Sequence, residues 1–286
     1  MRVRVGHKFH LSLPQPAPLI VMTAPEAARH ADFVAPEMFQ TDPPVPVHDY
    51  RDRNGNICRR ITAPAGELSI TADVTLEDRQ GWDPADADAR EVPVEELPDE
   101  VLTFLAPSRY VESDVLSTRA WELFGHLPPG WRRVQAILDH GHEVLRFDYG
   151  TASAFRTAEH CSRGGTAVCR DFAHLALAYL RGLNIPARYV NGYVGDIGVP
   201  PVDAPMDFAA WIEVWLSGRW WTFDPRNNDR RLGRVVIARG HDAADVPMLS
   251  SFGPHELVEF KVWCHAVDEV GRELPGLDFA PQPPKP

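Results

Sequence analysis

The sequence predicts an α+β fold, with a small β-rich region first and a larger region of helices and then strands after it. Short β-type runs separated by turn signals occupy the chain up to about residue 80. The hydrophobic period is helical between residues 113 and 184, and strand-like runs return between residues 187 and 264. Helices grouped before strands are typical of an α+β core, whereas a parallel α/β sheet needs them to alternate.

The N-terminal region contains β-type runs at residues 19–22, 57–61 and 68–74. Turn signals separate them, namely DRNGN at residues 52–56 and PAG at residues 64–66. We therefore assign residues 1–80 to an N-terminal β-domain. Residues 81–97 are rich in Asp, Glu, Pro and Ala without clear periodicity, and they are predicted to be an acidic linker.

A core domain is assigned to residues 98–270, and it begins with three helices. The first is predicted over residues 113–124 and the second starts at Trp131. The third spans roughly residues 166–180 and ends near Asn184, before a proline. Strands are predicted after them at residues 187–194, 211–216, 220–223, 235–238 and 257–264.

The tail, residues 271–286, is predicted to be disordered because it has five prolines among its last twelve residues and little to pack. Acidic side chains outnumber basic ones 40 to 29, and the formal charge is −11. That charge repels phosphate backbones and anionic bilayers, so neither nucleic acid nor a membrane is an expected partner. No apolar run approaches the roughly 18 residues of a membrane span, and we expect a cytoplasmic protein.

The four cysteines, Cys58, Cys161, Cys169 and Cys264, lack CxxC spacing. Neither a disulfide framework nor a zinc site is predicted, and no metal or cofactor is expected. Cys169 differs from the others because it falls in the first turn of a helix entered from Gly164-Gly165. Unpaired N–H groups and the helix dipole favour a thiolate there, although a cysteine at such a place is more often buried and inert.

A specific resemblance rests on two segments within residues 165–228. They read GTAVCRDFAHLALAYLRGLNIPARYVNGYVGD and DFAAWIEVWLSGRWWTFDPRNN, and together they resemble the transglutaminase-like superfamily. Weaker likeness to bacterial members with an N-terminal β-domain extends over most of the chain. The resemblance implies a papain-like core, in which a helix bearing cysteine at its N-terminus packs on an antiparallel sheet.

In that family a Cys-His-Asp triad acts on a carboxamide or peptide bond of a protein or peptide substrate through a thioester. The resemblance places the catalytic cysteine at Cys169 and the aspartate at Asp224. The histidine position falls on Ala209. If Ser217 and Gly218 form a two-residue turn, residue 209 is a diagonal neighbour of Asp224 on one sheet face, where histidine could reach the carboxylate and alanine cannot.

Without that imidazole the reaction loses its general base and its leaving-group acid. His160 and His241 are the candidate replacements, while His174 lies about 140° around the helix from Cys169 and is a poor one. Two hypotheses follow. The protein is either a cysteine amidohydrolase or acyltransferase with impaired or rearranged catalysis, or an inactive binding or scaffold protein. An engineered histidine-to-alanine change at position 209 would give the same sequence. The sequence specifies neither the substrate nor the oligomeric state.

Overall fold

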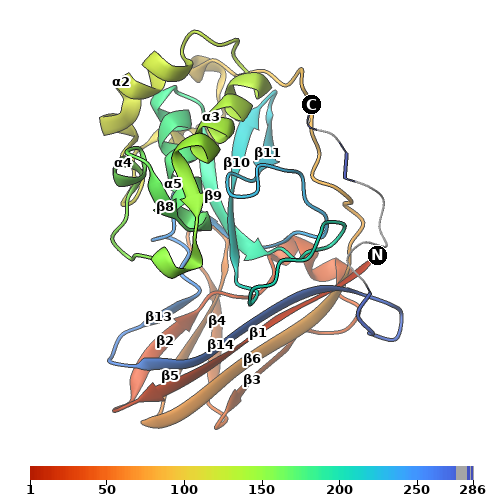
Figure 1. Ribbon diagram of the computed structural model, residues 1–286. Coiled ribbons are helices and arrows are strands. Elements are labelled where there is room, and N and C mark those ends of the chain that lie inside the picture. The colour runs from red at the N-terminus through yellow and green to blue at the C-terminus, as the bar shows by residue number, and fades with distance from the viewer. Residues whose placement is uncertain (275–281, 284, 286) are drawn as a thin grey trace.

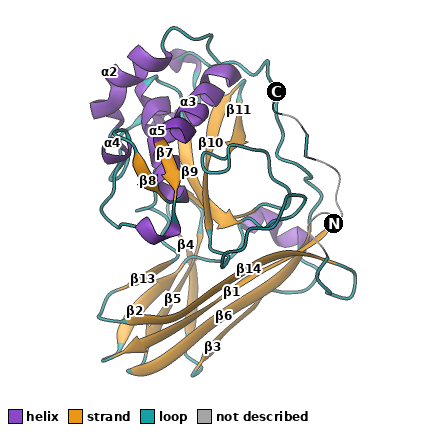
Figure 2. Ribbon diagram, in the orientation of Figure 1, coloured by secondary structure: helices purple, strands orange, loops and turns teal. Residues whose placement is uncertain are grey.

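A β-sandwich and a mixed helix-and-sheet core make up the molecule, one on top of the other (Figures 1 and 2). The computed structural model describes residues 1–274, 282–283 and 285. The predicted α+β class is confirmed, as is the β-rich N-terminal region.

Two four-stranded antiparallel sheets form the sandwich, in the orders β14-β1-β6-β3 and β13-β2-β5-β4. Along β1 and β6 apolar side chains alternate with polar ones, so that one face of each strand is buried between the sheets. The strands are β1 (Arg2–Leu13), β2 (Ala17–Val21), β3 (Met38–Asp42), β4 (Val47–Arg51), β5 (Ile57–Ala63), β6 (Gly66–Glu77), β13 (Leu249–Ser251) and β14 (Glu256–Val267).

The last long strand belongs to the sandwich and not to the core sheet. A strand at residues 257–264 is predicted within the core domain, but β14 pairs with β1 from Arg2↔Val267 to Ser12↔Glu256. Local hydrophobic periodicity predicts that a segment is a strand, but it does not predict which distant strand pairs with it. The described start of the tail continues this sheet, since the Leu274 N–H donates to the Ala266 carbonyl at 2.8 Å. Most of the predicted disordered tail, 275–281, 284 and 286, lies outside the described residues.

The core packs helix α5 (Cys169–Gly182) against a four-stranded antiparallel sheet of order β11-β10-β9-β12. Helix α2 (Ser113–Phe124) covers the other side of α5, as Figure 2 shows. The core strands are β9 (Ala187–Tyr193), β10 (Ala209–Leu216), β11 (Arg219–Phe223) and β12 (Val235–Gly240). A parallel pair, β7 (Leu145–Phe147) and β8 (Gly165–Ala167), lies beside the helices. The other helices are α1 (Asp99–Leu102), α3 (Trp131–Val144), α4 (Ala158–Cys161), η1 (Ala27–Asp32), η2 (Val94–Glu96), η3 (Thr103–Leu105) and η4 (Tyr149–Thr151).

The β10–β11 hairpin has the predicted two-residue turn. Leu216 pairs with Arg219, and Ser217 and Gly218 have φ values of 49° and 77°. Two positive φ values fit a type I′ turn, whose twist matches that of the strands. The last ladder pair is Ile212↔Phe223, and the same register places Trp211 opposite Asp224, as predicted.

The acidic linker packs along the core. Ala89 is buried and its carbonyl accepts from the Trp131 N–H at 2.9 Å, at the start of α3. Arg90 exchanges two hydrogen bonds with Ser217 at the hairpin turn, each 2.8 Å long. The segment thus bonds to the first residue of α3 and to the tip of the hairpin, although its composition indicates only a solvated connector. The predicted domain bounds themselves stay predictions.

The sandwich and the core meet through buried polar contacts. The Asn56 amide of the β4–β5 turn donates to the Arg239 carbonyl and accepts from the Arg239 N–H, both at 2.9 Å. On β1, His7 Nδ1 lies 3.2 Å from the Tyr193 hydroxyl, which itself donates to the Thr23 carbonyl at 3.1 Å. Tyr193 therefore accepts from His7, and His7 is the neutral Nδ1–H tautomer with Nε2 buried and unbonded.

We predict that His7 makes the fold sensitive to mild acid. Burial, with a smaller effect of the Arg59 charge, lowers the pKa of His7 to about 3 from 6.5. As the pH falls from 6.5 toward about 3, His7 is protonated in the unfolded chain but not in the folded one. It therefore lowers the free energy of unfolding by up to ~1.4 kcal/mol per pH unit over that range. In urea titrations His7→Phe should show a shallower loss of unfolding free energy across that range, whereas exposed His160→Gln should not. Equal slopes in all three proteins would contradict this.

Candidate functional site

Cys169 lies in the first turn of α5, as predicted, and buried Asp171 holds it there. The helix begins at Cys169 and not at the predicted residue 166, because Gly165–Ala167 forms strand β8. The Asp171 carboxylate accepts from the Val168 main-chain N–H at 3.0 Å, which caps the start of the helix. Arg156 pairs with the same carboxylate at 2.7 Å. Asp171 is fully buried and therefore supports the helix start instead of lining the cleft, while the Cys169 side chain is half-buried. The other three cysteines are buried, and all four are free thiols.

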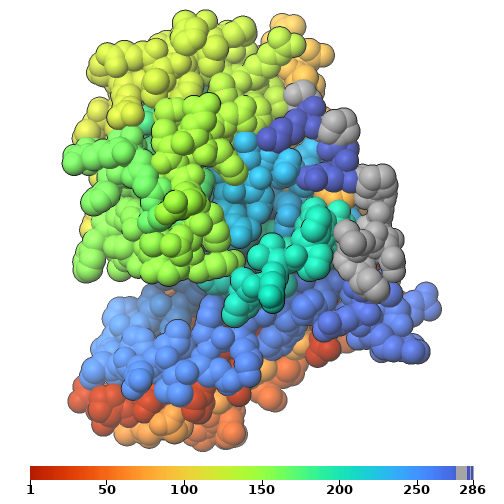
Figure 3. Space-filling model, in the orientation of Figure 1, coloured from red at the N-terminus to blue at the C-terminus, as the bar shows by residue number. Residues whose placement is uncertain are grey.

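Two cavities of about 480 Å³ each meet at Cys169, and we call them together the Cys169 cleft. The first opens toward β14 and has charged walls, and the second has tyrosines and Met248 in its wall. In Figure 3 the turquoise segment between β9 and β10 lies over the boundary between the core and blue β14. The residues that line both cavities are Tyr149, Cys169, Asp207, Phe208, Ala209 and Ala210.

Position 209 is beside the thiol. Ala209 lines both cavities with Cys169, and so does the next residue, Ala210, whose main-chain N–H acts to lower the pKa of the thiol. Residue 209 lies at the junction of the cavities, and its mapping to the histidine position stays a prediction. Alanine leaves the junction open. Among the described residues, the only histidine lining either cavity is His265 on β14, which is 3.7 Å from Glu273. The sequence alone does not indicate that His265 lies here, because β14 reaches the cleft by pairing with the distant strand β1.

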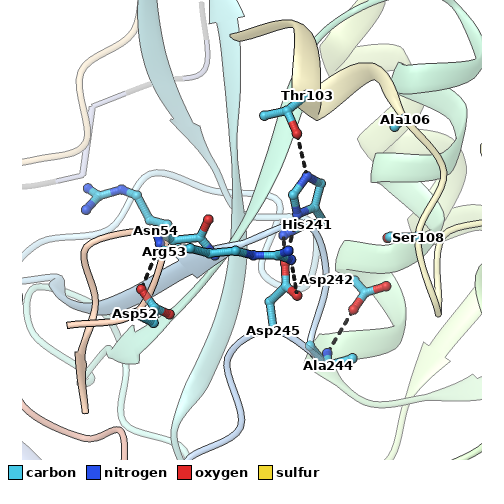
Figure 4. Close-up of polar contacts among 12 residues, drawn as sticks. Asp52, Arg53, Asn54, Thr103, Ala106, Ser108, His241, Asp242, Ala244 and Asp245 are labelled. Carbon is cyan, nitrogen blue, oxygen red and sulfur yellow. Dashed lines mark hydrogen bonds and ion pairs between the residues drawn. The ribbon is translucent and has the colours of Figure 1, made fainter. Parts of the chain in front are cut away.

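The two predicted replacement histidines are elsewhere. His241 Nε2 is 2.9 Å from the Thr103 hydroxyl and its Nδ1 is 2.8 Å from Asp245, whose other oxygen meets Arg53 of the β4–β5 turn at 3.2 Å (Figure 4). His160 is exposed on α4. Neither lines the Cys169 cleft.

His174 does not line either cavity. It is fully buried, accepts the Ala243 N–H at 3.2 Å and stacks on Tyr110 at 5.1 Å between ring centroids. Its imidazole supports the loop after β12, which forms part of the second cavity. Burial, followed by the charges of Arg170 and Arg181, lowers the pKa of His174 well below its usual value.

The electrostatics around Cys169 oppose a thiolate. Burial raises the pKa of the Cys169 thiol to about 11, and the Asp207 charge adds to that effect. The Ala210 and Arg170 N–H groups and the Arg226 charge act in the opposite direction without offsetting it. A cysteine at a helix N-terminus can have a depressed pKa, but here no imidazolium is present to stabilise the anion. The thiol is protonated at neutral pH.

Asp224 is engaged by Arg234 and does not line either cavity. The Arg234 guanidinium pairs with Asp224 Oδ2 at 2.6 Å and with Asp83 of the linker at 2.8 Å, and it lies over the Trp211 ring at 4.9 Å. All three charged groups are buried or nearly so. Burial disfavours the Asp224 carboxylate, but Arg234 and the Asn227 hydrogen bonds outweigh it and lower the pKa below its usual value.

The same carboxylate shapes the turn after β11. Asp224 Oδ1 accepts from the Asn227 main-chain N–H at 2.9 Å, and Oδ2 accepts from the Asn227 amide at 2.8 Å. The Asp224 carbonyl accepts from Asn228, which has a φ of 53°, at 2.7 Å. Arg226 is the second residue of this turn, and its side chain lines the first cavity. Asp224 thus fixes the turn that presents Arg226 to the cleft.

The part of the chain that the structure describes has neither a cluster of metal-ligating side chains nor a helix suited to span a membrane. No three His, Cys, Asp or Glu side chains of that part gather in a way that could hold a metal ion. None of its helices combines the length and the hydrophobicity that a bilayer crossing requires.

Comparison with known proteins agrees with this geometry. The profile of the Transglutaminase-like superfamily matches residues 122–225. A Mycobacterium leprae protein is 38% identical over 107 residues, which are 35% of this chain and 36% of that protein. A Mycobacterium tuberculosis protein is 41% identical over 93 residues, 29% of each chain. The matched segment thus spans about a third of these relatives.

A crystal structure extends the likeness to the whole fold. A protein of Cytophaga hutchinsonii, described as a candidate cysteine protease, superposes with a TM-score of 0.81 at 27% identity. The match covers 99% of this chain and 93% of that one, sandwich included. The fold and the cysteine at the helix start define a protein with a papain-like core. Residues 122–225 of this chain match the transglutaminase-like superfamily, and the fold as a whole is similar to that of the Cytophaga hutchinsonii protein. The catalytic roles of Cys169 and Asp224 stay predictions.

We predict that the pH dependence of Cys169 alkylation is that of an unactivated thiol. With iodoacetamide, and with the site read by peptide mass spectrometry, the rate should rise with pH toward a midpoint of about 11 and show no plateau near neutral pH. In Ala209→His an imidazolium beside the sulfur should move the midpoint toward neutral pH. A plateau near neutrality in the unchanged protein would show that another group activates the thiol. Unreactive Cys169 in both proteins would count against its assignment as the nucleophile position.

We also predict that Arg234→Met destabilises the fold by about 3–5 kcal/mol, because it leaves the buried Asp83 and Asp224 carboxylates uncompensated. Urea unfolding followed by tryptophan fluorescence measures the change. Arg219→Met removes an exposed arginine over Trp221 and should shift stability by less than about 0.5 kcal/mol. Adding Asp83→Asn and Asp224→Asn to Arg234→Met should recover part of the loss. Similar stabilities for the two arginine variants would refute the role given to Arg234.

Proposed function

We propose that this protein binds a peptide or carboxamide-bearing ligand in the Cys169 cleft and does not turn it over. One observation carries the proposal: two of the three triad positions are disconnected from the thiol. Position 209 has no imidazole, and the Asp224 carboxylate is bound by Arg234 and Asn227. The reaction through a thioester needs a base to take the thiol proton and an acid for the leaving amine. Among the described residues, no imidazole bonds to Cys169 to supply either.

The cleft itself supports binding. Its two cavities have the size of small-ligand sites and join across the cysteine, as an extended chain passing over the thiol would require. The second cavity offers aromatic side chains, Tyr110, Tyr149 and Tyr189, that can pack against such a chain. We also propose that the partner is a protein or a peptide and that the protein is located in the cytoplasm.

Acyl transfer or hydrolysis with a rearranged base is the second candidate function. The observation that favours it is His265, which lines the same cavity as Cys169. His265 has no hydrogen bond with the thiol, and its nearest charged partner is Glu273. This function requires His265 to move toward Cys169 when a substrate is bound, and then His265→Ala should abolish any turnover.

To test this, a tryptic digest of casein is passed over the immobilised protein, and the retained and unretained peptides are identified by mass spectrometry. We expect a subset of peptides to be retained with unchanged masses, equally by the unchanged protein and by Cys169→Ala. Ala209→Phe should lose retention because its ring fills the junction between the cavities. The matched control is Ala87→Phe, at an exposed alanine of the linker outside the cleft.

Two results would refute the proposal. Cleaved or deamidated peptides that form with the unchanged protein and not with Cys169→Ala would show catalysis, and His265→Ala would then identify the base. Retention that is no greater than for Ala209→Phe would show that the cleft does not bind peptides.

A further inference from the structure

Arg226 is the arginine of the Cys169 cleft that has no carboxylate partner among the described residues. Arg231 of the first cavity pairs with Asp196 at 3.2 Å, and Arg170 of the second pairs with Asp171 at 3.4 Å. The half-buried Arg226 donates only to the Asn227 side-chain oxygen, at 2.7 Å, and its guanidinium lies 4.1 Å over the Phe147 ring. A guanidinium has five N–H donors in a planar fork, so most of its capacity is unused.

The surroundings keep this cation in place. Phe147 fixes one face of the guanidinium, and the turn anchored by Asp224 fixes its backbone. The Arg226 charge reaches both Cys169 and Tyr149, since it lowers the pKa of each against the larger opposing effect of burial. Arg226 is therefore a preorganised cation close to the thiol, and its side chain has lost much of the freedom that an arginine gives up on binding.

We propose that Arg226 binds a carboxylate of the ligand in the Cys169 cleft, so that the ligand class is a peptide with an acidic side chain or a free C-terminus. The inference rests on the proposed binding function and names its ligand. A carboxylate matches the guanidinium fork in a bidentate pair, which is among the strongest polar contacts that proteins make. With a formal charge of −11, the protein as a whole repels anions, so attraction at this point must come from a local cation.

The test uses Cys169 as a reporter of local charge. Iodoacetate and iodoacetamide alkylate thiols in the same way and differ in carrying a carboxylate or an amide. We expect the ratio of the iodoacetate rate to the iodoacetamide rate at Cys169, read by mass spectrometry at alkaline pH, to fall about tenfold in Arg226→Met. In Arg226→Lys the ratio should lie between those of the unchanged protein and Arg226→Met. Arg219→Met is the matched control, because Arg219 also lies over an aromatic ring, at 4.3 Å, but outside the cleft.

Protection distinguishes the two sources of carboxylate. Three acetylated alanine tripeptides are added before iodoacetamide: one with a free C-terminus, one amidated, and one amidated with a central glutamate. The first should protect Cys169 if a C-terminal carboxylate is bound, and the third if an acidic side chain is bound. The fully amidated peptide should not protect, and Arg226→Met should remove the protection.

An equal rate ratio in the unchanged protein and Arg226→Met would overturn the proposal. So would an equal fall in Arg219→Met and Arg226→Met, which would show only the bulk charge of the protein. Protection by the amidated peptide as strong as by the acidic ones would also overturn it. The rate ratio does not depend on turnover, so a Cys169-dependent conversion of peptides would end the non-catalytic proposal while leaving the Arg226 result to be judged separately.

Discussion

The ion pair of Arg234 with Asp83 and Asp224 determines how the site is built. One buried guanidinium joins the linker, the β10–β11 hairpin and the turn that follows it, and it lies over Trp211 in the core sheet. Buried charges are tolerated only when they are paired and hydrogen-bonded. Removing any one of the three side chains would leave a buried charge unpaired, and its desolvation would then destabilise the fold. This constraint fixes the Asp224 carboxylate, and the turn after β11 takes its shape from that carboxylate.

The Asp224 carboxylate has one use in the hypothetical triad and another in this structure. In a triad its carboxylate would orient an imidazole at position 209 and stabilise the positive charge that develops there. Here Arg234 and Asn227 occupy its oxygens, and the main result is a rigid turn that carries Arg226 to the cleft. Alanine at position 209 does not leave the carboxylate unpaired, because Arg234 and Asn227 bond to it.

Sequence reasoning succeeds where the determinants are local. The α2, α3 and α5 helices follow from their hydrophobic period, and the hairpin follows from Ser217-Gly218, because a type I′ turn depends on two adjacent residues. It fails where the determinant is a distant partner. The β1–β14 pairing, the contact of Arg234 with Asp83 and the presence of His265 in the cleft each join segments far apart in the chain. Arg226 had a weak local signal, since it follows Asp224-Pro225, but its lack of a partner becomes evident only from the fold.

The pairing of β14 with β1 explains why the sandwich matters to the cleft. Val262, Cys264 and His265 of β14 form part of the first cavity, while Cys169 and Arg226 come from the core. A ligand in that cavity would contact both units, and its binding would stabilise their docked arrangement by the free energy of those contacts. The buried His7–Tyr193 contact and the Asn56–Arg239 pair hold the same junction in the unliganded protein. Cleft geometry and sandwich docking are thus coupled, and a change that loosens the junction should weaken ligand binding even where it touches no residue of the cleft.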